Sequence, residues 1–561
     1  MSIRRPIRRF PGRLRRRIRT TLLLAAAVGA ATGLAVALVD SVIVDWTWGP
    51  LSRRSDWWIA LLPLAGLGLS SALLQFTRER STETTEEYIR VFHDRRARVR
   101  LRSVPLRLAA SIATIGLGGS MGLEGPSIYT GAAMGDVAER RFARSMLEED
   151  RKVLLVAGAA AGIAAIFKAP VTGIVFALEV PYRDDLARRA LIPAMIASAS
   201  SYVVFASIIG TTPLFPVEAA SLRLADLAGA VLVGLACGLA ARVFIATLRT
   251  SVRLARRLPF RARALACAVV VGAAGAVSLA VFHRPFALGP GYDPILRAAR
   301  GAIAPGLLVA LLGMKIVATS GTVAGNGVGG LFFPSVMMGA AVGGALGDVV
   351  PGPASLFAVV GIAAFLGGAY KVPLAGVAFV AETTGAPGYI IPGLIAAAIA
   401  YLASGRGSLS HRQRFRRLID VESRLDMPVS EVMSREWIEV PSDASLHDVA
   451  TQFAIRAKAR TLPVVEEGRY VGMASLGALG DVPHDTWEST PVVAITARDH
   501  PALRPTDRLN VALARMRDAD VDRAAVVDAG RIVGILTTSE VIRVEQILDT
   551  VDEEQRRGLG M

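Results

Sequence analysis

The stretch that decides the fold is GLEGPSIYTGAAMG at residues 122–135, together with its copy GLFFPSVMMGAAVG at residues 330–343. A second pattern, K-x-P-x-x-G-x-x-F-x-x-E, begins at Lys168 and again at Lys371. The offsets are 208 residues (122 to 330) and 203 residues (168 to 371), and the order is the same in both halves. Two motifs that recur in order indicate an internal duplication. Each copy places Gly and Pro where an apolar helix would otherwise continue.

The composition places most of this chain in a membrane. Of 561 residues, 52% are apolar and 20% charged, and the mean hydropathy is +0.46. The apolar runs lie in residues 20–404, whereas residues 405–561 have the composition of a soluble domain. This excludes a purely soluble enzyme and a disordered scaffold. A helix needs roughly 20 apolar residues to cross a bilayer. The candidate spans are 22–44, 57–76, 104–121, 153–180, 190–210, 224–248, 264–282, 303–320, 331–349, 355–384 and 388–404.

Gly and Pro interrupt or border several of these spans, at 122–126, 170–173, 325–334 and 373–376. Broken backbone at membrane depth is tolerated where it is buried in protein or lines a cavity, and matched breaks in two repeats point to a substrate site between them. The predicted fold is therefore an all-α polytopic membrane protein with an inverted internal repeat (about 20–210 and 222–404), followed by an α/β C-terminal module.

The net charge of +16 comes largely from arginine blocks that flank the apolar spans. Such flanks orient spans and contact anionic lipid headgroups. A nucleic-acid partner is not expected, because no aromatic residues interleave with these blocks. Nine arginines precede Thr20, so residues 1–19 are expected to be a basic cytoplasmic tail before a retained first helix. The two cysteines lie in apolar runs, so neither a disulfide framework nor a metal site is expected.

The C-terminal part also contains a repeat. LPVVEEGRYVG at residues 462–472 aligns with AAVVDAGRIVG at residues 524–534. A helical stretch precedes each copy, two β-rich runs follow, and a further helix is expected after them, which makes two βαββα units. We expect a linker at 405–425, the two units at 426–484 and 485–548, and a C-terminal tail at 549–561. The module is expected to lie in the cytoplasm.

The membrane motif suits an anion. In both copies a Pro stands in what would be the first helical turn, where its missing N–H costs no hydrogen bond. The free N–H groups and the helix dipole at such a start attract negative charge. Glu124 stands in the first copy where Phe332 stands in the second. Because its carboxylate is itself an anion, Glu124 can fill the site and must then move or be protonated before a free anion passes. A simpler alternative is that Glu124 only satisfies amides of its own helical turn.

These motifs resemble those of the CLC chloride channel and transporter family, over about residues 20–548, and the C-terminal pair resembles tandem CBS domains. The resemblance implies a homodimer with one pore in each subunit, gated by Glu124. It further implies that the amides of Leu331 and Phe332 contact a central anion, and that those from Leu123 to Gly125 lie near an external one.

The sequence departs from the family pattern at three places. The first motif should fall near residues 81–85, where STETT stands, so Thr82 or Ser81 is expected to supply the missing hydroxyl. The family's pore tyrosine should lie within 408–411, and Ser410 occupies that position. Val180 stands where exchangers of the family often carry a proton-relay glutamate.

These departures favour passive conduction, since Val180 cannot carry a proton. Glu179 and its repeat mate Glu382 are expected to be structural, in a helix cap or an ion pair with arginine. His93 and His411 are expected to be solvated surface residues. In the tail, Thr537 and Glu540 fit one adenine-nucleotide site by resemblance, and a purely structural tail is the alternative.

The sequence thus predicts a channel for chloride or similar small monovalent anions. The protein is expected to reside in the cell membrane, to require no cofactor and to catalyse no reaction. A proton-coupled chloride exchanger is the alternative. A CBS-regulated divalent-cation transporter, an intramembrane enzyme and a regulatory membrane sensor are more remote.

Overall fold

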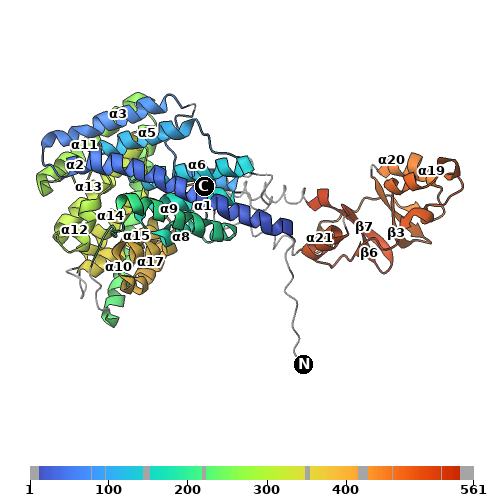
Figure 1. The fold of residues 1–561 in the computed structure, drawn as a ribbon. Helices are drawn as coiled ribbons and strands as arrows, with labels where there is room; N and C mark the ends of the chain where they lie inside the picture. The colour runs from blue at the N-terminus through green and yellow to red at the C-terminus, as the bar shows by residue number, and fades with distance from the viewer. Residues whose placement is uncertain are drawn as a thin grey trace. The chain divides into compact units, whose positions relative to one another are not determined.

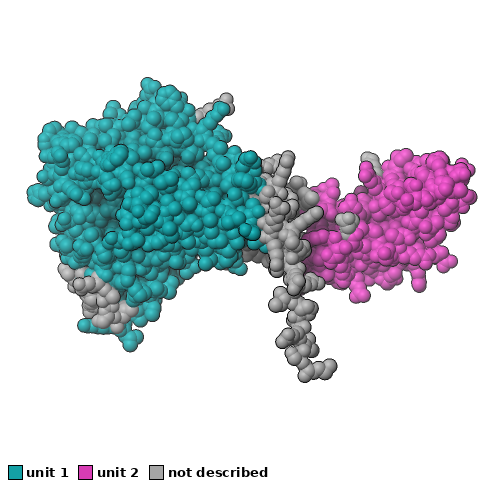
Figure 2. All heavy atoms as spheres, viewed as in Figure 1, with its two compact units in different colours: residues 1–417 teal, residues 418–561 magenta. Residues whose placement is uncertain are grey.

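The computed structural model describes residues 12–77, 79–94, 97–142, 152–217, 223–347, 354–414, 427–457, 459–519, 521–541 and 543. It forms two compact units, residues 1–417 and 418–561, which Figures 1 and 2 show. Residues 1–11 of the expected tail (1–19), the linker portion 415–425 and the C-terminal tail at 549–561 lie outside the described residues. Residues 12–19 of the expected tail belong to the first helix, α1 (Gly12–Asp40).

The regular elements among the described residues of the first unit are all helices, and the two sequence repeats divide them. The first half contains α1 (Gly12–Asp40), α2 (Trp48–Ser52), α3 (Leu62–Leu74), α4 (Thr85–His93), α5 (Ser103–Gly116), α6 (Glu124–Phe142), α7 (Val153–Phe167), α8 (Pro170–Glu179) and α9 (Leu191–Ile209). The second half contains α10 (Leu224–Ala255), α11 (Phe260–Phe282), α12 (Tyr292–Ala299), α13 (Pro305–Ala324), α14 (Phe332–Ala345), α15 (Ala354–Ala369), α16 (Pro373–Thr384) and α17 (Ile390–Ala403).

Long helices surround shorter ones in this unit. Six segments are long and apolar enough to cross a bilayer: Ile18–Ser52, Trp57–Leu74, Arg188–Ile209, Asp226–Ala255, Phe260–Phe282 and Pro305–Ala324. The shorter apolar helices include α7, α8, α14 and α15, whose residues are largely buried. The predicted helical membrane body is confirmed. Its duplicated motifs lie at the starts of α6 and α14 and at the starts of α8 and α16.

Two predicted spans are each a pair of helices. Residues 153–180 form α7 and α8, and residues 355–384 form α15 and α16. Lys168 and Lys371 end the first helix of each pair in the left-handed conformation, with φ of 52° and 61°. The following Pro residues cannot continue a helix because they lack an N–H. Both repeats therefore turn sharply at the same motif position.

Close packing of repeat-related glycines joins the inner helices. A Cβ on Gly131 of α6 would collide with the backbone of Gly158 on α7, and a Cβ on Gly158 would collide with Gly131. In the second repeat, a Cβ on Gly339 of α14 would collide with the backbone of Gly361 on α15, and a Cβ on Gly361 would collide with that of Gly339. Small residues allow helix backbones to approach closely inside a membrane. The glycines of the first motif thus serve helix packing as well as the site.

The second unit contains two small sheets. The first has the order β1-β2-β3-β4, with β1 Val440–Pro441, β2 Thr461–Glu466, β3 Arg469–Ser475 and β4 Thr496–Ala497. The second has the order β5-β6-β7, with β5 Ala502–Leu503, β6 Arg523–Asp528 and β7 Arg531–Thr537. The α-helices are α19 (Leu446–Asp448), α20 (Ala454–Ala457) and α21 (Leu509–Asp518).

The two sheets share details that support the internal repeat. Each has a parallel outer strand and an antiparallel hairpin, and the hairpin register shifts at Val464/Val465 and at Val526/Val527. The helix expected after β3 is a 3₁₀ helix over Leu476–Asp481, which contains two glycines. Glycine lowers helix stability, which accounts for this difference. The predicted α/β module is otherwise confirmed.

Candidate functional site

The two halves of the duplication meet at the glycines that begin the two motifs. Gly122 N–H donates to the Gly330 carbonyl at 2.9 Å, and Gly330 N–H donates to the Gly122 carbonyl at 2.7 Å. α6 begins at Glu124 and α14 at Phe332, so both prolines of the motifs lie in first turns, as predicted. The N-termini of two helices from opposite repeats therefore converge on one place.

The Glu124 carboxylate occupies the start of the other repeat's helix. Its Oε1 accepts hydrogen bonds from the N–H groups of Phe332, at 2.6 Å, and Phe333, at 3.4 Å. The side chain is 1% exposed, and Oε2 has no hydrogen-bond partner among the described residues. Glu124 thus does more than satisfy its own helical turn, because it places a carboxylate on the amides of α14.

Aromatic rings enclose this contact. The ring of Phe332 lies 4.7 Å from that of Phe167 and 5.0 Å from that of Phe379, and the ring of Phe333 lies 4.5 Å from that of Tyr292. Aromatic side chains offer an anion no competing negative oxygen and exclude water. The donors seen to bind the Glu124 carboxylate here are the backbone N–H groups of Phe332 and Phe333.

Cavities approach the contact from two parts of the unit. One cavity, of about 640 Å³, includes Gly330, Leu331 and Tyr370 in its wall. Another, of about 500 Å³, includes Tyr292, whose ring packs on Phe333. Glu124 lines neither of these two cavities. Glu124 and the phenylalanines of α14 therefore separate the ends of two hollow regions.

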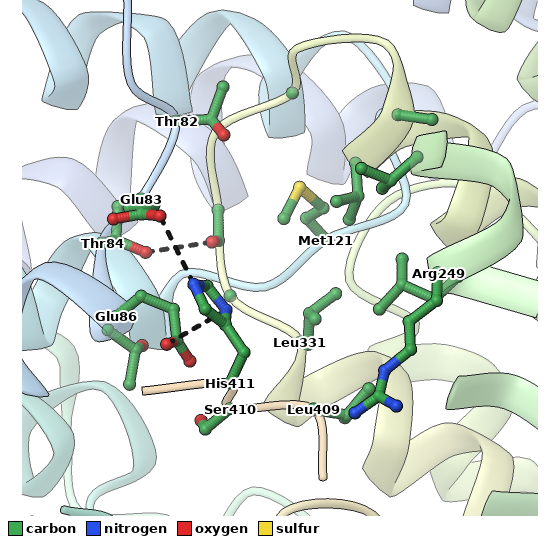
Figure 3. A pocket seen from close by; sticks show the side chains of 18 of the residues that line it. Thr82, Glu83, Thr84, Glu86, Met121, Arg249, Leu331, Leu409, Ser410 and His411 are labelled. Carbon is green, nitrogen blue, oxygen red and sulfur yellow. Dashed lines mark hydrogen bonds and ion pairs between the residues drawn. The ribbon is translucent and has the colours of Figure 1, made fainter. Parts of the chain in front are cut away.

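The first cavity, drawn in Figure 3, contains several predicted site residues. Thr82, Leu331 and Ser410 all line it. Leu123 and Gly125 do not, and they are buried behind it, where a Cβ on Gly125 would meet the Gly329 carbonyl. The structure thus brings the hydroxyl candidates to the lining of one cavity, whereas the first-motif residues Leu123 and Gly125 are buried and do not line it.

Charged side chains surround the first cavity. Its acidic members are Glu83 and Glu86, and its basic members are Arg80, Arg249, Arg253, Arg256, Arg263 and His411. His411 lies 3.7 Å from Glu83 and 3.3 Å from Glu86, as the dashed lines in Figure 3 show. The basic excess favours the entry of an anion. The second cavity also has a basic excess, from Arg53, Lys168, Arg284 and Arg297 against Asp40 and Asp293.

The altered first motif contributes a hydroxyl that sequence reasoning missed. Thr84 Oγ1 donates to the Gly329 carbonyl at 3.1 Å, and the same oxygen would meet a Cβ placed on Gly125. Ser81 Oγ instead accepts the Glu83 N–H at 3.2 Å within its own turn. The motif STETT offered four hydroxyls, and only the tertiary fold shows which one reaches the glycine segment.

Glu179 and Glu382 cap each other's repeat. Glu179 accepts hydrogen bonds from Leu374 and Ala375 N–H at the start of α16, at 3.2 and 2.9 Å. Glu382 accepts them from Val171 and Thr172 N–H at the start of α8, at 2.9 and 2.7 Å. Of the two structural roles expected for this pair, the cap is the one observed.

One of the two predictions for histidines is wrong. His93 is half-buried, its Nε2 lies 2.8 Å from the Pro181 carbonyl, and its ring packs on Tyr182, so the expected solvated surface position is wrong. The cause is the packing of α4 against the chain after α8, which sequence periodicity does not reveal. His411 has an exposed side chain but faces the two acids of the cavity.

In the second unit, Thr537 and Glu540 contact each other. Thr537 Oγ1 donates to Glu540 Oε2 at 2.8 Å, and Glu540 N–H donates back to Thr537 Oγ1 at 3.2 Å. This reciprocal arrangement is typical of a helix start, so both residues already have partners within the chain.

Sequence comparisons agree with the geometry. The sequence model of the family described as voltage gated chloride channel matches residues 65–405, and that of the CBS domain matches residues 429–479 and 492–546. Chloride channel protein CLC-f of Arabidopsis thaliana is 32% identical over 410 residues, which are 65% of this chain and 51% of that protein. The chain therefore spans about half the length of this relative.

Bacterial relatives are covered more fully. The chloride/fluoride channel protein of Pseudomonas syringae pv. tomato is 28% identical over 401 residues, 70% of this chain and 85% of the relative. The H(+)/Cl(−) exchange transporter ClcA of Salmonella arizonae is 30% identical over 402 residues, 67% of this chain and 83% of the relative. The relatives thus include proteins named as channels and proteins named as exchangers.

Solved structures show the same fold. A CLC-type fluoride/proton antiporter superposes with a TM-score of 0.62 at 22% identity, covering 71% of this chain and 98% of that one. A eukaryotic CLC transporter superposes with a TM-score of 0.57 at 18% identity, covering 93% of this chain and 98% of that one. Since the family model matches more than half of the sequence, the chain belongs to the voltage-gated chloride channel (CLC) family and carries tandem CBS domains.

Proposed function

We propose that the chain is a channel for chloride and similar small monovalent anions, with one pathway in each subunit of a homodimer, and that Glu124 is its gate. The observation that carries this proposal is the Glu124 carboxylate on the N–H groups of Phe332 and Phe333. A free anion competes for the same donors, because helix-start amides attract negative charge. The carboxylate therefore blocks the anion that it imitates.

The same geometry suggests how an anion is held and released. The amides of Leu331 and Phe332 are proposed as the central contacts, and those of Leu123 and Gly125 as contacts toward the other cavity. Amide dipoles carry only partial charge, so the anion is bound without a permanent counter-ion and can leave. Thr82 and Ser410 are proposed as hydroxyl contacts along the cavity wall.

Passive conduction is the proposed mode of transport. Val180 cannot carry a proton, and the neighbouring Glu179 carboxylate is engaged in the cap of α16. Proton-coupled exchange remains the second candidate, because Glu86 and His411 place two protonatable groups in the wall of the first cavity. A divalent-cation pathway is disfavoured, since Glu124, Glu179 and Glu382 all accept backbone N–H groups, which point positive charge at the carboxylates.

Reconstitution of the full chain into liposomes tests the proposal. Chloride efflux down its gradient is the expected result, and its absence would refute anion transport by this chain. The zero-current voltage is then measured with equal chloride and unequal pH on the two sides. A channel gives a voltage near zero, whereas a voltage that follows the proton gradient would establish the exchanger and refute passive conduction.

We further propose that the protein resides in the cell membrane, with its N-terminus and its CBS module in the cytoplasm.

We also propose that Thr537 and Glu540 contact an adenine nucleotide. Nucleotide binding has to compete with the hydrogen bonds between these two residues. Thermal unfolding of the full chain with and without ATP tests this. A rise in melting temperature that Glu540→Gln abolishes supports the site, and the absence of any rise favours a purely structural tail.

A further inference from the structure

Five arginine side chains in the wall of the first cavity have no carboxylate partner. They are Arg80, Arg249, Arg253, Arg256 and Arg263. No ion pair among the described residues includes any of them. Arg249 donates to the Ser408 carbonyl at 3.2 Å and Arg263 donates to Asn326 Oδ1, and both of these acceptors are neutral. The described part of the protein thus leaves this positive charge uncompensated.

Three of the five arginines share one face of a helix. Arg249 and Arg253 lie on α10, and Arg256 directly follows its last residue. Side chains at spacings of four and three residues are neighbours on a helix surface, and like charges at such spacings repel one another. All three residues are exposed and line the cavity. A negatively charged ligand between them would relieve the repulsion.

The ring of Phe260 brings the other two arginines together. The guanidinium carbon of Arg80 lies 5.7 Å from the centroid of this ring, and that of Arg263 lies 5.3 Å from it. These are cation–π distances. Asn326 holds the arrangement, because its Nδ2 donates to the Phe260 carbonyl at 2.9 Å while its Oδ1 accepts from Arg263. Two guanidinium groups are therefore positioned at the cavity by uncharged partners.

The two acids of the cavity do not neutralise these arginines. Glu83 accepts two hydrogen bonds from Arg412, at 3.2 and 3.0 Å. Glu86 accepts the Arg412 N–H at 3.0 Å and lies 3.3 Å from His411. Figure 3 shows Glu83 and Glu86 grouped around His411, with Arg249 apart from them. The acids are engaged within their own group, and a single chloride ion would leave most of the arginine charge unbalanced.

We propose that the arginine side of the first cavity binds a ligand with two or more phosphate groups, and that the bound ligand obstructs the passage of small anions to Leu331. This inference rests on the proposed anion pathway, because Leu331 lines the same cavity. Planar guanidinium groups donate paired hydrogen bonds to phosphate oxygens. The cavity volume of about 640 Å³ admits a ligand much larger than chloride.

Two sources present this chemistry. One is a soluble polyphosphate, and the other is the phosphate headgroup of an anionic lipid, which basic pockets at a membrane surface also bind. Inorganic tripolyphosphate represents the soluble source, and it lacks the adenine and ribose that the CBS module would contact. Cardiolipin, which carries two phosphates, represents the lipid source.

Calorimetric titration of the full chain in detergent with tripolyphosphate tests binding. Exposed charge contacts each contribute about threefold in affinity, so the dissociation constant should rise about threefold in Arg256→Gln and about tenfold in Arg253→Gln/Arg256→Gln. Arg257→Gln is the matched control. Arg257 is the next residue, is also exposed and does not line the cavity, so its variant should bind as the parent does. Equal weakening in the Arg256 and Arg257 variants would overturn the site.

Chloride efflux from phosphatidylcholine vesicles, with tripolyphosphate on both sides, tests obstruction. Flux through the parent and through Arg257→Gln should fall as tripolyphosphate rises, and Arg253→Gln/Arg256→Gln should need about tenfold more for the same fall. Replacing part of the phosphatidylcholine with cardiolipin tests the lipid source. A fall in parental flux that the double variant relieves, without any effect of tripolyphosphate, would establish the lipid as the ligand.

The remaining outcomes separate this inference from the proposed function. If neither tripolyphosphate nor cardiolipin changes chloride flux, the obstruction is refuted and the proposed function stands. If tripolyphosphate binding depends on Arg256 but the parent carries no chloride, the site stands and the proposed function fails. Thermal unfolding of each variant checks that a loss of binding does not come from a loss of fold.

Discussion

Gly122 and Gly330, which are equivalent residues of the two repeats, are joined by two backbone hydrogen bonds of 2.9 and 2.7 Å. This short antiparallel bridge aligns the starts of α6 and α14, and it leaves no room for a side chain on either glycine. A Cβ on Gly122 or on Gly330 would overlap the carboxylate end of Glu124. The bridge therefore fixes both the helix starts and the space in which the gate rests.

Gly330→Ala should expel the Glu124 side chain from its resting place. The three atoms nearest to the new methyl group all belong to that side chain, which can move without unfolding the backbone. We expect chloride flux to rise and its response to pH to weaken. Efflux from proteoliposomes at pH 5 to 8 measures both. Flux and pH response identical to those of the parent would show that the carboxylate position does not control the pathway.

Glu124→Gln should open the pathway at neutral pH. A hydrogen bond to a charged acceptor is stronger than one to a neutral acceptor by about 1.5 kcal/mol, so occupancy of the Phe332 amide should fall about tenfold. In the parent, flux should rise as pH falls, because protonation removes the carboxylate charge. In the variant, flux should be high and independent of pH. Flux and pH response equal to those of the parent would contradict the gate assignment.

Glu179→Gln and Glu382→Gln should each weaken the fold and leave the selectivity of transport unchanged. Each removes a charged acceptor from two N–H groups at a helix start, which should cost about 1–3 kcal/mol of unfolding free energy. Thermal unfolding in detergent measures the loss, and anion competition in proteoliposomes measures selectivity. If Glu179→Gln altered proton movement without lowering stability, Glu179 would be a proton carrier.

Gly158→Ala should prevent assembly of the inner helices. Its Cβ would meet the backbone of Gly131, which cannot rotate away as a side chain can. Gly361→Ala should have the same effect in the second repeat, because its Cβ would meet the backbone of Gly339. We expect little protein in the monodisperse fraction on size exclusion. Gly313→Ala, on α13, is the matched control, because a Cβ there meets nothing within 4 Å. Normal yield of the Gly158 variant would contradict this account of the packing.

The CBS unit should lose stability in mild acid through His500. Burial lowers the pKa of this imidazole below its usual value of about 6.5. The unfolded chain therefore binds the proton more readily, and stability is full above about pH 6.5 and falls as pH drops toward the lower pKa of the folded state. Thermal unfolding from pH 8 to 5 should show this fall, and His500→Gln should reduce it. Identical pH profiles would exclude His500 as the cause.

The duplication explains why so much of the site was predictable. Matching glycines and prolines are covalent features of the sequence, so the convergence of two helix starts at Glu124 followed from them. The identity of the hydroxyl group that reaches the site did not follow from the sequence. Thr84 reaches the glycine segment through a contact between elements far apart in the chain, and local sequence patterns carry no record of such a contact. For the same reason, sequence reasoning left open whether Glu179 and Glu382 form caps or ion pairs.

The exchanged caps also constrain biosynthesis. The N–H groups of Val171 and Thr172 find their acceptor in Glu382, 211 and 210 residues later in the chain. A nascent chain that has inserted only its first half holds these polar groups without that acceptor, at a place where lipid provides none. The first half therefore completes its own hydrogen bonding only after the second half has left the ribosome. A translocon or a chaperone has to shelter α8 during that interval.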